Sequence, residues 1–149
     1  MKVFVYEIDG VVCVGSAPNN ENIENIENIE DIANLSVPRG VKYLILDSLD
    51  LPKEPQESWY IEDGQIKIDQ QKLIEFNRKN MPALTPIEFD IKLVDAGLYE
   101  QVQDLISKDI KLKIAYTRAT FFSRIDPFID QARIALNLTD EQVDEMWTS

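Results

Sequence analysis

Histidine is absent from this chain of 149 residues. It is the side chain whose ordinary pKa lies closest to neutrality, and it is therefore the commonest general base and a frequent metal ligand. Its absence excludes Ser-His and Cys-His nucleophile pairs and histidine zinc sites. We therefore expect a protein that is not an enzyme, with no catalytic, cofactor-binding or metal-binding residues.

Cysteine and long apolar runs are scarce as well. The one cysteine, Cys13, excludes an internal disulfide and a cysteine-based metal site, and its apolar neighbours predict a small core residue. No stretch approaches the roughly 18 apolar residues of a membrane span. The first residues turn acidic too soon for a signal sequence. These features predict a soluble protein of a reducing cytoplasm, with no membrane partner.

Basic residues are outnumbered, 15 against 27 acidic ones, and the formal net charge is −12. Nucleic acids and anionic membranes bind proteins largely through Lys and Arg, so we expect neither as a partner. The acidic residues are spread along the chain, which favours solubility. The alternative is mimicry of a DNA phosphate array, by which the protein would block a DNA-binding enzyme.

Two Asp-Gly pairs in the first half predict two β-hairpins. Residues 2–7 and 11–14 flank Asp9-Gly10, and residues 58–61 and 65–68 flank Glu62-Asp63-Gly64. Asp-Gly suits a type I′ turn, which needs positive φ at both central positions. A further strand is expected at 41–46, and its nearly continuous apolar end indicates burial on both faces. Residues 47–57 predict a surface loop, and residues 70–79 a helix.

An Asn-Ile-Glu repeat occupies residues 21–30 and continues into Asp31 to Leu35. Its isoleucines recur every three positions, whereas an α-helix turns by about 100° per residue, so the apolar side chains drift around the axis. We predict a helix over 22–35 whose first turns are weakly anchored. The repeat either lengthens that helix, which we favour, or forms a ridge that binds a partner.

The second half begins at a boundary, Asn80 to Pro86, where two prolines disfavour helix. A helix is then predicted from Thr85 as N-cap, with Pro86 at its first position and Glu88 completing a capping box. Gly97 ends it. Along this helix an apolar stripe is formed by Ile87, Ile91 and Val94.

Further helices follow at about 98–107 and 110–122, after Asp126-Pro127, and after Thr139, which has Gln142 as its capping-box partner. Leu138 and Val143 occupy the positions of a hydrophobic staple. The side chains expected to face inward are Leu98, Val102, Leu105, Ile106, Ile114, Ala115, Ala119, Phe122, Phe128, Ile129, Ala132, Ala135 and Leu136. The fold class is therefore α+β. A small antiparallel sheet with one or two helices is expected over 1–79, a linker over 80–86 and a compact helical domain over 84–149.

Short segments between residues 31 and 147 form an ordered pattern. In the first half they are Asp31-Ile32-Ala33, Val37-Pro38-Arg39-Gly40-Val41-Lys42-Tyr43, Leu51-Pro52, Trp59 and Gly64-Gln65-Ile66. In the second they are Pro86-Ile87-Glu88-Phe89, Gly97-Leu98-Tyr99, Ile114-Ala115-Tyr116, Ala119-Thr120-Phe121, Asp126-Pro127-Phe128 and Leu138-Thr139-Asp140-Glu141-Gln142-Val143-Asp144-Glu145-Met146-Trp147. This combination resembles small accessory proteins encoded beside the tail-fibre genes of tailed bacteriophages and prophages.

The chain departs from that pattern at two places. The Asn-Ile-Glu repeat stands where a short helix is usual, and Asp126 stands where a histidine usually precedes the proline matched by Pro127. The second departure argues against any role that needs an imidazole there. The resemblance implies a tail-region accessory role, in which the protein helps a fibre or tail protein fold or attach, or decorates the tail.

The expected function is accordingly that of a non-enzymatic tail-fibre assembly factor, chaperone or tail accessory protein that binds a phage tail or tail-fibre protein. Association with further copies of the chain is left open. The expected location is the host cytoplasm, and retention in the virion is also left open. The alternative function is an acidic phage-encoded inhibitor of a host defence nuclease.

The candidate protein-binding residues are Trp59, Tyr60 and Trp147. On a strand, Trp59 and Tyr60 point to opposite faces, so one is core and the other can serve as an exposed partner contact. Trp147 either docks onto the helical domain as a core residue or projects to a partner. Two weaker hypotheses are a magnesium site, with Asp9, Asp47 and Asp50, and single-stranded nucleic acid stacking, with Arg118, Phe121, Phe122 and Arg124.

Overall fold

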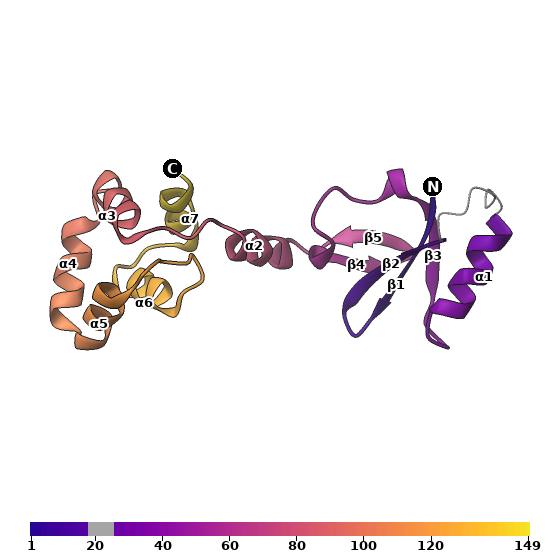
Figure 1. Cartoon of the computed structure of the whole chain (residues 1–149), viewed down its shortest axis with the longest axis horizontal. Coiled ribbons are helices and arrows are strands. Elements are labelled where there is room, and N and C mark those ends of the chain that lie inside the picture. Colours follow the sequence, from indigo (N-terminus) through magenta and orange to yellow (C-terminus); the bar gives the residue numbers. More distant parts are fainter. Residues whose placement is uncertain (18–25) are drawn as a thin grey trace. The chain divides into compact units, whose positions relative to one another are not determined.

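The computed structural model describes residues 1–17 and 26–149. Contacts divide the chain into two compact units, Met1–Phe76 and Asn77–Ser149, and every named strand lies in the first (Figure 1). The expected α+β class is confirmed. The division falls within helix α2 (Gln70–Lys79), just ahead of the linker expected at 80–86. Among the described residues, no helix is long and apolar enough to cross a membrane.

A three-stranded antiparallel sheet forms the centre of the first unit. It contains β1 (Lys2–Ile8), β2 (Val11–Ser16) and β3 (Tyr43–Asp47) in the order β2-β1-β3. Ile8 pairs with Val11 across a two-residue turn in which φ is 51° at Asp9 and 76° at Gly10. Positive φ at both positions is what a type I′ turn requires, so the expected hairpin is confirmed.

The second expected hairpin is confirmed in the same way. It joins β4 (Trp59–Glu62) to β5 (Gln65–Ile68), with φ of 52° at Asp63 and 72° at Gly64. Because side chains alternate along β1, Val3 and Val5 pack with Trp59, whereas Phe4 points to the opposite face. That face is covered by α1 (Ile26–Ser36), with Ile29 and Ala33 buried against Phe4, as Figure 1 shows beside β3.

Several details of the first unit differ from the sequence-based predictions. Cys13 is half-buried, because its side chain lies on an edge strand. Each residue of β3 is partly exposed, since this strand is the other edge of the sheet. The loop at 47–57 includes two short 3₁₀ turns, η1 (Ser48–Asp50) and η2 (Gln56–Ser58). Residues 22–25 of the predicted helix, and the start of the repeat, lie outside the described residues.

The second unit is helical, and its helices enclose one core. They are α3 (Pro86–Asp95), α4 (Tyr99–Lys108), α5 (Ile110–Arg118), α6 (Pro127–Ala135) and α7 (Asp140–Thr148). Both predicted capping boxes are present: Thr85 with Glu88 on α3, and Thr139 with Gln142 on α7. Aromatic rings fill the centre, where Phe89 stacks on Phe122 with ring centroids 4.3 Å apart.

The helix predicted over 110–122 is shorter than expected and turns a different face inward. It ends at Arg118, because Ala119 is extended, and Phe122 exchanges two backbone hydrogen bonds with Leu84. Leu112 is buried, whereas Ile114 and Ala115 are exposed, contrary to prediction. Ala135, also expected inside, is exposed at the end of α6.

Candidate functional site

The aspartates considered for a magnesium site are not brought together. Asp47 pairs with Lys2 at the start of β1, whereas Asp9 follows the last residue of that strand. Seven extended residues separate the two positions by about 20 Å. Asp47 instead accepts a hydrogen bond from Leu49 N–H and lies 3.3 Å from the amino group of Met1. No cluster of His, Cys, Asp and Glu that is suited to a metal occurs among the residues described.

The residues considered for nucleic acid stacking are also dispersed. Phe122 is buried and Phe121 is 63% exposed, so the two rings do not form one platform. Arg124 is 4% exposed and lies inside the helical unit. Its Nε atom is 2.7 Å from Asp144, and its Nη2 atom is 3.0 Å from Asp140. A buried, paired guanidinium of this kind holds helices together rather than meeting phosphates.

An ion-pair network surrounds Arg124. Asp144 also accepts hydrogen bonds from Arg78, with 2.8 Å between Nη2 and Oδ2, and Asp140 lies 3.3 Å from Arg133. The hydrogen bond from Arg124 lowers the pKa of Asp140, and the hydrogen bond to Asp144 raises the pKa of Arg78. The network joins α7 to Arg78 at the end of α2, to Arg124 and to Arg133 on α6. The pairing with arginines accounts for the placement of Asp140 and Asp144 without a bound ligand.

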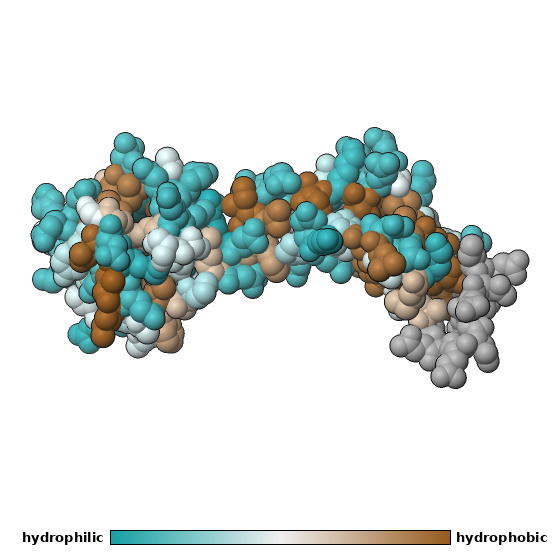
Figure 2. All heavy atoms as spheres, turned by 90° about the horizontal axis from the view of Figure 1, so that it is seen from above, coloured by the Kyte–Doolittle hydropathy of each residue, from teal (hydrophilic) through white to brown (hydrophobic). Residues whose placement is uncertain are grey.

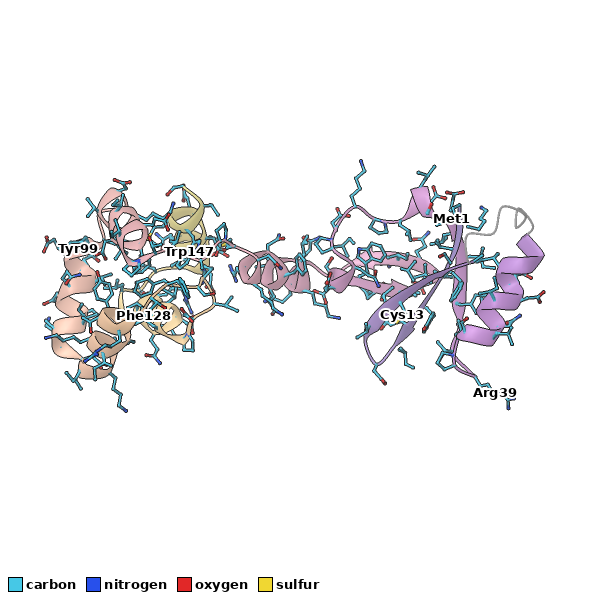
Figure 3. All side chains as sticks on the ribbon, in the orientation of Figure 1. Met1, Cys13, Arg39, Tyr99, Phe128 and Trp147 are labelled. Atoms are coloured by element: carbon cyan, nitrogen blue, oxygen red, sulfur yellow. The ribbon has the colours of Figure 1, made fainter. Side chains whose placement is uncertain are left out.

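Both tryptophans have structural roles. Trp147 is 2% exposed, its Nε1 donates to the carbonyl of Pro82 at 2.8 Å, and its ring lies 5.9 Å from that of Phe89. Figure 3 shows Trp147 among the helices of its unit. Trp59 is 6% exposed and donates to the carbonyl of Glu54 at 2.9 Å. Tyr60, on the opposite face of β4, is half-buried. The protein-binding role expected for these three residues stays a prediction.

An unexpected apolar surface lies on α3. Ile87, Ile91 and Val94 are 73%, 54% and 59% exposed, although a stripe at this spacing normally packs on a core. The core contacts of α3 come instead from Phe89 and Leu93, both 3% exposed. Figure 2 shows hydrophobic side chains at the surface among hydrophilic ones. We call the face formed by Ile87, Ile91 and Val94 the outer face of α3.

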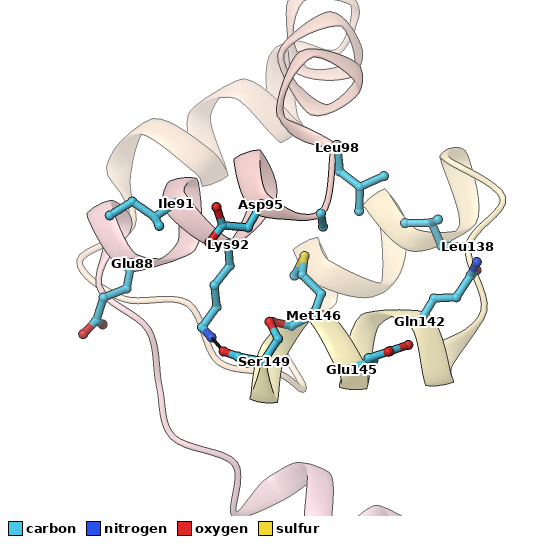
Figure 4. Close-up of a pocket in the computed structure, with 11 residues that line it drawn as sticks. Glu88, Ile91, Lys92, Asp95, Leu98, Leu138, Gln142, Glu145, Met146 and Ser149 are labelled. Carbon is cyan, nitrogen blue, oxygen red and sulfur yellow. Dashed lines mark hydrogen bonds between the residues drawn. The ribbon is translucent and has the colours of Figure 1, made fainter.

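A groove of about 690 Å³ borders this outer face and runs between α3 and α7. Its apolar lining comes from Ile91, Leu98, Leu138 and Met146, and we call it the α3–α7 groove. In Figure 4, Lys92 reaches across to Ser149, and its Nζ donates to the main-chain oxygen at 2.5 Å. This hydrogen bond bridges α3 and α7 beside the apolar residues of the groove.

Three carboxylates belong to the lining of the groove. They are those of Glu88, Asp95 and Glu145. Within the described part of the chain, none of the three forms an ion pair. Hydrogen bonds from Thr85 lower the pKa of Glu88, so it is ionised at neutral pH. The site therefore combines an apolar floor with an acidic rim.

A small void of about 30 Å³ shares Leu98, Leu138 and Met146 with the lining of the groove. Arg133 apart, the side chains that line the void are apolar, so it offers water few hydrogen-bond partners.

The sequence of α3 contained a signal for this exposed surface that helix caps and apolar spacing alone do not show. Half of the ten residues of α3 are aliphatic or aromatic, at Ile87, Phe89, Ile91, Leu93 and Val94. They fall on two sides of the helix, which is more than one core face can bury.

Comparison of the chain with known protein families, with curated proteins and with solved structures finds no match.

Proposed function

We propose that this protein acts by binding another protein, through the outer face of α3 and the adjoining α3–α7 groove. The observation that carries the proposal is the exposed stripe of Ile87, Ile91 and Val94 beside an apolar groove. Contiguous apolar surface of this kind is costly to leave in water and commonly marks an interface. Its lining has no nucleophile paired with a base, so the chemistry it favours is recognition rather than catalysis.

We further propose that the partner is a phage tail or tail-fibre protein, and that the chain is a tail-fibre assembly factor, chaperone or tail accessory protein. The ordered resemblance running from residue 31 to residue 147 supports this part of the proposal. It includes Leu138 to Trp147, which supplies Leu138, Gln142, Glu145 and Met146 to the groove, and Pro86-Ile87-Glu88-Phe89, which supplies Glu88. The site of action would be the host cytoplasm, where the fibre is made.

Co-expression with the tail-fibre protein encoded beside this gene tests the proposal. We expect the fibre protein to become more soluble and to co-purify with the tagged chain. The Ile87→Ser/Ile91→Ser variant should lose both effects, because it removes apolar contact area from the outer face of α3. Unchanged fibre solubility together with no co-purification would count against a tail-fibre partner.

The acidic inhibitor of a host defence nuclease is the second candidate, and the net charge of −12 favours it. A phosphate mimic needs a dense array of unpaired carboxylates. In the helical unit, Asp130, Asp140 and Asp144 are instead paired with arginines. We therefore rank this function below protein assembly. Rescue of phage plating on a defence-carrying host would reverse that ranking.

A further inference from the structure

The walls of the α3–α7 groove determine which backbone conformation its occupant can adopt. Both walls are α-helices, whose main-chain N–H and C=O groups are largely bonded within each helix. An extended segment gains affinity from main-chain hydrogen bonds to a sheet edge, and these walls offer none. A helical segment satisfies its own main-chain groups and needs only side-chain contacts. These walls therefore favour a helical occupant over an extended one.

The floor of the groove determines one face of that helix. Ile91, Leu98, Leu138 and Met146 give the groove its apolar lining. The outer face of α3 extends this surface by Ile87 and Val94. Because α3 has ten residues, or about 15 Å of helix, the contact spans roughly two to three turns of the occupant.

The rim determines the charge of the occupant. Glu88, Asp95 and Glu145 line the groove, and none forms an ion pair within the described part of the chain. Lys92, the cation of the lining, already donates to Ser149. Lysine or arginine side chains on the flanks of the occupant would pair with these carboxylates, whereas acidic side chains would be repelled.

We propose that the α3–α7 groove binds a short amphipathic helix of a partner protein, apolar on one face and flanked by Lys and Arg. This inference rests on the proposed protein-binding function and adds the chemical class of the segment that is bound. It corresponds to the helix-in-groove mode of recognition, in which apolar anchors at i, i+3, i+4 and i+7 fill the groove.

A second copy of the chain is a less suitable occupant. Its α5 has the right character, since Ile110 and Ile114 are exposed and Lys111, Lys113 and Arg118 carry the charge. That helix would bring a whole chain of net charge −12 toward an acidic rim. A basic segment of another protein carries no such repulsion.

A pair of synthetic peptides tests the proposal on the intact chain. One is a capped Leu-Lys peptide of about 14 residues with leucines at helical spacing. The other has Glu in place of every Lys. We expect the Lys peptide to bind, to shift the methyl NMR signals of Ile91 and Met146, and to become helical. We expect the Glu peptide not to bind. Asp95→Lys/Glu145→Lys should reverse this preference.

Two matched variants separate groove binding from general attraction to an acidic protein. Ile91→Ser should weaken the Lys peptide about tenfold, the loss expected for one buried aliphatic contact. Ile114→Ser on α5 should leave binding unchanged, although Ile91 and Ile114 are equally exposed, at 54% each. Equal losses in both variants, or no loss in Ile91→Ser, would overturn the proposal. So would a concentration-dependent dimer that Ile91→Ser dissociates.

The same variants distinguish failure of this inference from failure of the proposed function. If the tail-fibre protein co-purifies equally with wild type and Ile91→Ser, protein binding stands and the groove is the wrong site. If the Lys peptide binds in the groove but no tail protein co-purifies, the chemistry of the groove stands and the proposed partner is wrong.

Discussion

Helices α3 and α7 begin in the same way but use their apolar residues differently. Each starts with a threonine N-cap and a complete capping box. Helix α7 buries all three of its large apolar side chains, Val143, Met146 and Trp147. Helix α3 buries Phe89 and Leu93 but leaves its Ile87-Ile91-Val94 stripe, its outer face, in contact with solvent.

The difference between the two helices shows which features are local and which are tertiary. A capping box depends on residues within one turn, so it forms wherever its sequence occurs. Which face is buried depends on where the neighbouring helices lie. On α7 one apolar face meets the core and nothing is left over, whereas α3 carries apolar residues on two sides. The surplus apolar face is what we assign to a partner.

The largest expected effect concerns α7. Trp147→Ala should destabilise the helical unit by about 3–5 kcal/mol, because it removes a large ring from a packed core and leaves a cavity. It also leaves the carbonyl of Pro82 without its donor at 2.8 Å. Urea unfolding of the intact chain, followed by far-UV circular dichroism, measures the change.

Trp147→Phe serves as the matched control. It keeps a ring against Phe89 but loses the indole N–H, so it should cost clearly less than the alanine variant. If Trp147→Ala left the unfolding curve unchanged, the burial of α7 described above would be wrong. Trp147 would then be available as the partner contact that the sequence also allowed.

The local features of the fold were largely predictable from sequence. The Asp9-Gly10 and Asp63-Gly64 turns formed as expected, because Asp and Gly tolerate the positive φ that these hairpins require. Which face of a helix is buried, and where a helix ends, were less predictable. Helix α5 stops at Arg118 because Phe122 pairs with Leu84, a contact between residues far apart in the chain. No local sequence pattern predicts a contact of that kind.

The candidate site was less predictable than the fold. From the sequence, the tryptophans were the leading candidates, because aromatic side chains are frequent at interfaces. Size alone does not distinguish a partner contact from a core residue, and Trp59 and Trp147 are both buried. The α3–α7 groove combines Ile91 with Leu138 and Met146, which are brought together only when α3 packs on α7. The carboxylates of the groove could not be distinguished from sequence, because acidic residues are spread along the whole chain.

The second prediction compares the two caps directly. Thr139→Ala and Thr85→Ala should each destabilise the helical unit by about 1 kcal/mol, because each leaves a backbone N–H of the first turn without its acceptor. Urea midpoints at pH 7 measure both. Similar losses would confirm that caps act locally. A loss at Thr139 several times larger than at Thr85 would show that burial of the helix amplifies its cap.

The third prediction compares the carboxylates at the two helix starts. The Arg124 hydrogen bond lowers the pKa of Asp140, and the Thr85 hydrogen bonds lower that of Glu88. A lowered folded-state pKa contributes stability above the unfolded value, which is lost as pH falls through the folded value, here below about pH 4. Asp140→Asn should therefore flatten the acid loss of stability more than Glu88→Gln, because Arg124 is buried. The check is the melting temperature of both variants and wild type, measured from pH 7 to pH 3. The same fall in melting temperature with pH in all three proteins would contradict the prediction.

The smallest expected effect concerns the outer face of α3. Ile91→Ser and Val94→Ser should each change the free energy of unfolding by no more than about 0.5 kcal/mol, since exposed side chains lose little apolar burial. Leu93→Ala, on the opposite side of the same helix, should cost about 2–5 kcal/mol. Urea unfolding of the three variants under identical conditions compares them.

Near-neutral stability at Ile91 and Val94 would mean that folding does not require this apolar stripe. Any loss of partner binding in Ile91→Ser would then report the interface alone. A stability loss at Ile91 approaching that at Leu93 would instead place the stripe in the core and remove the basis for assigning it to a partner.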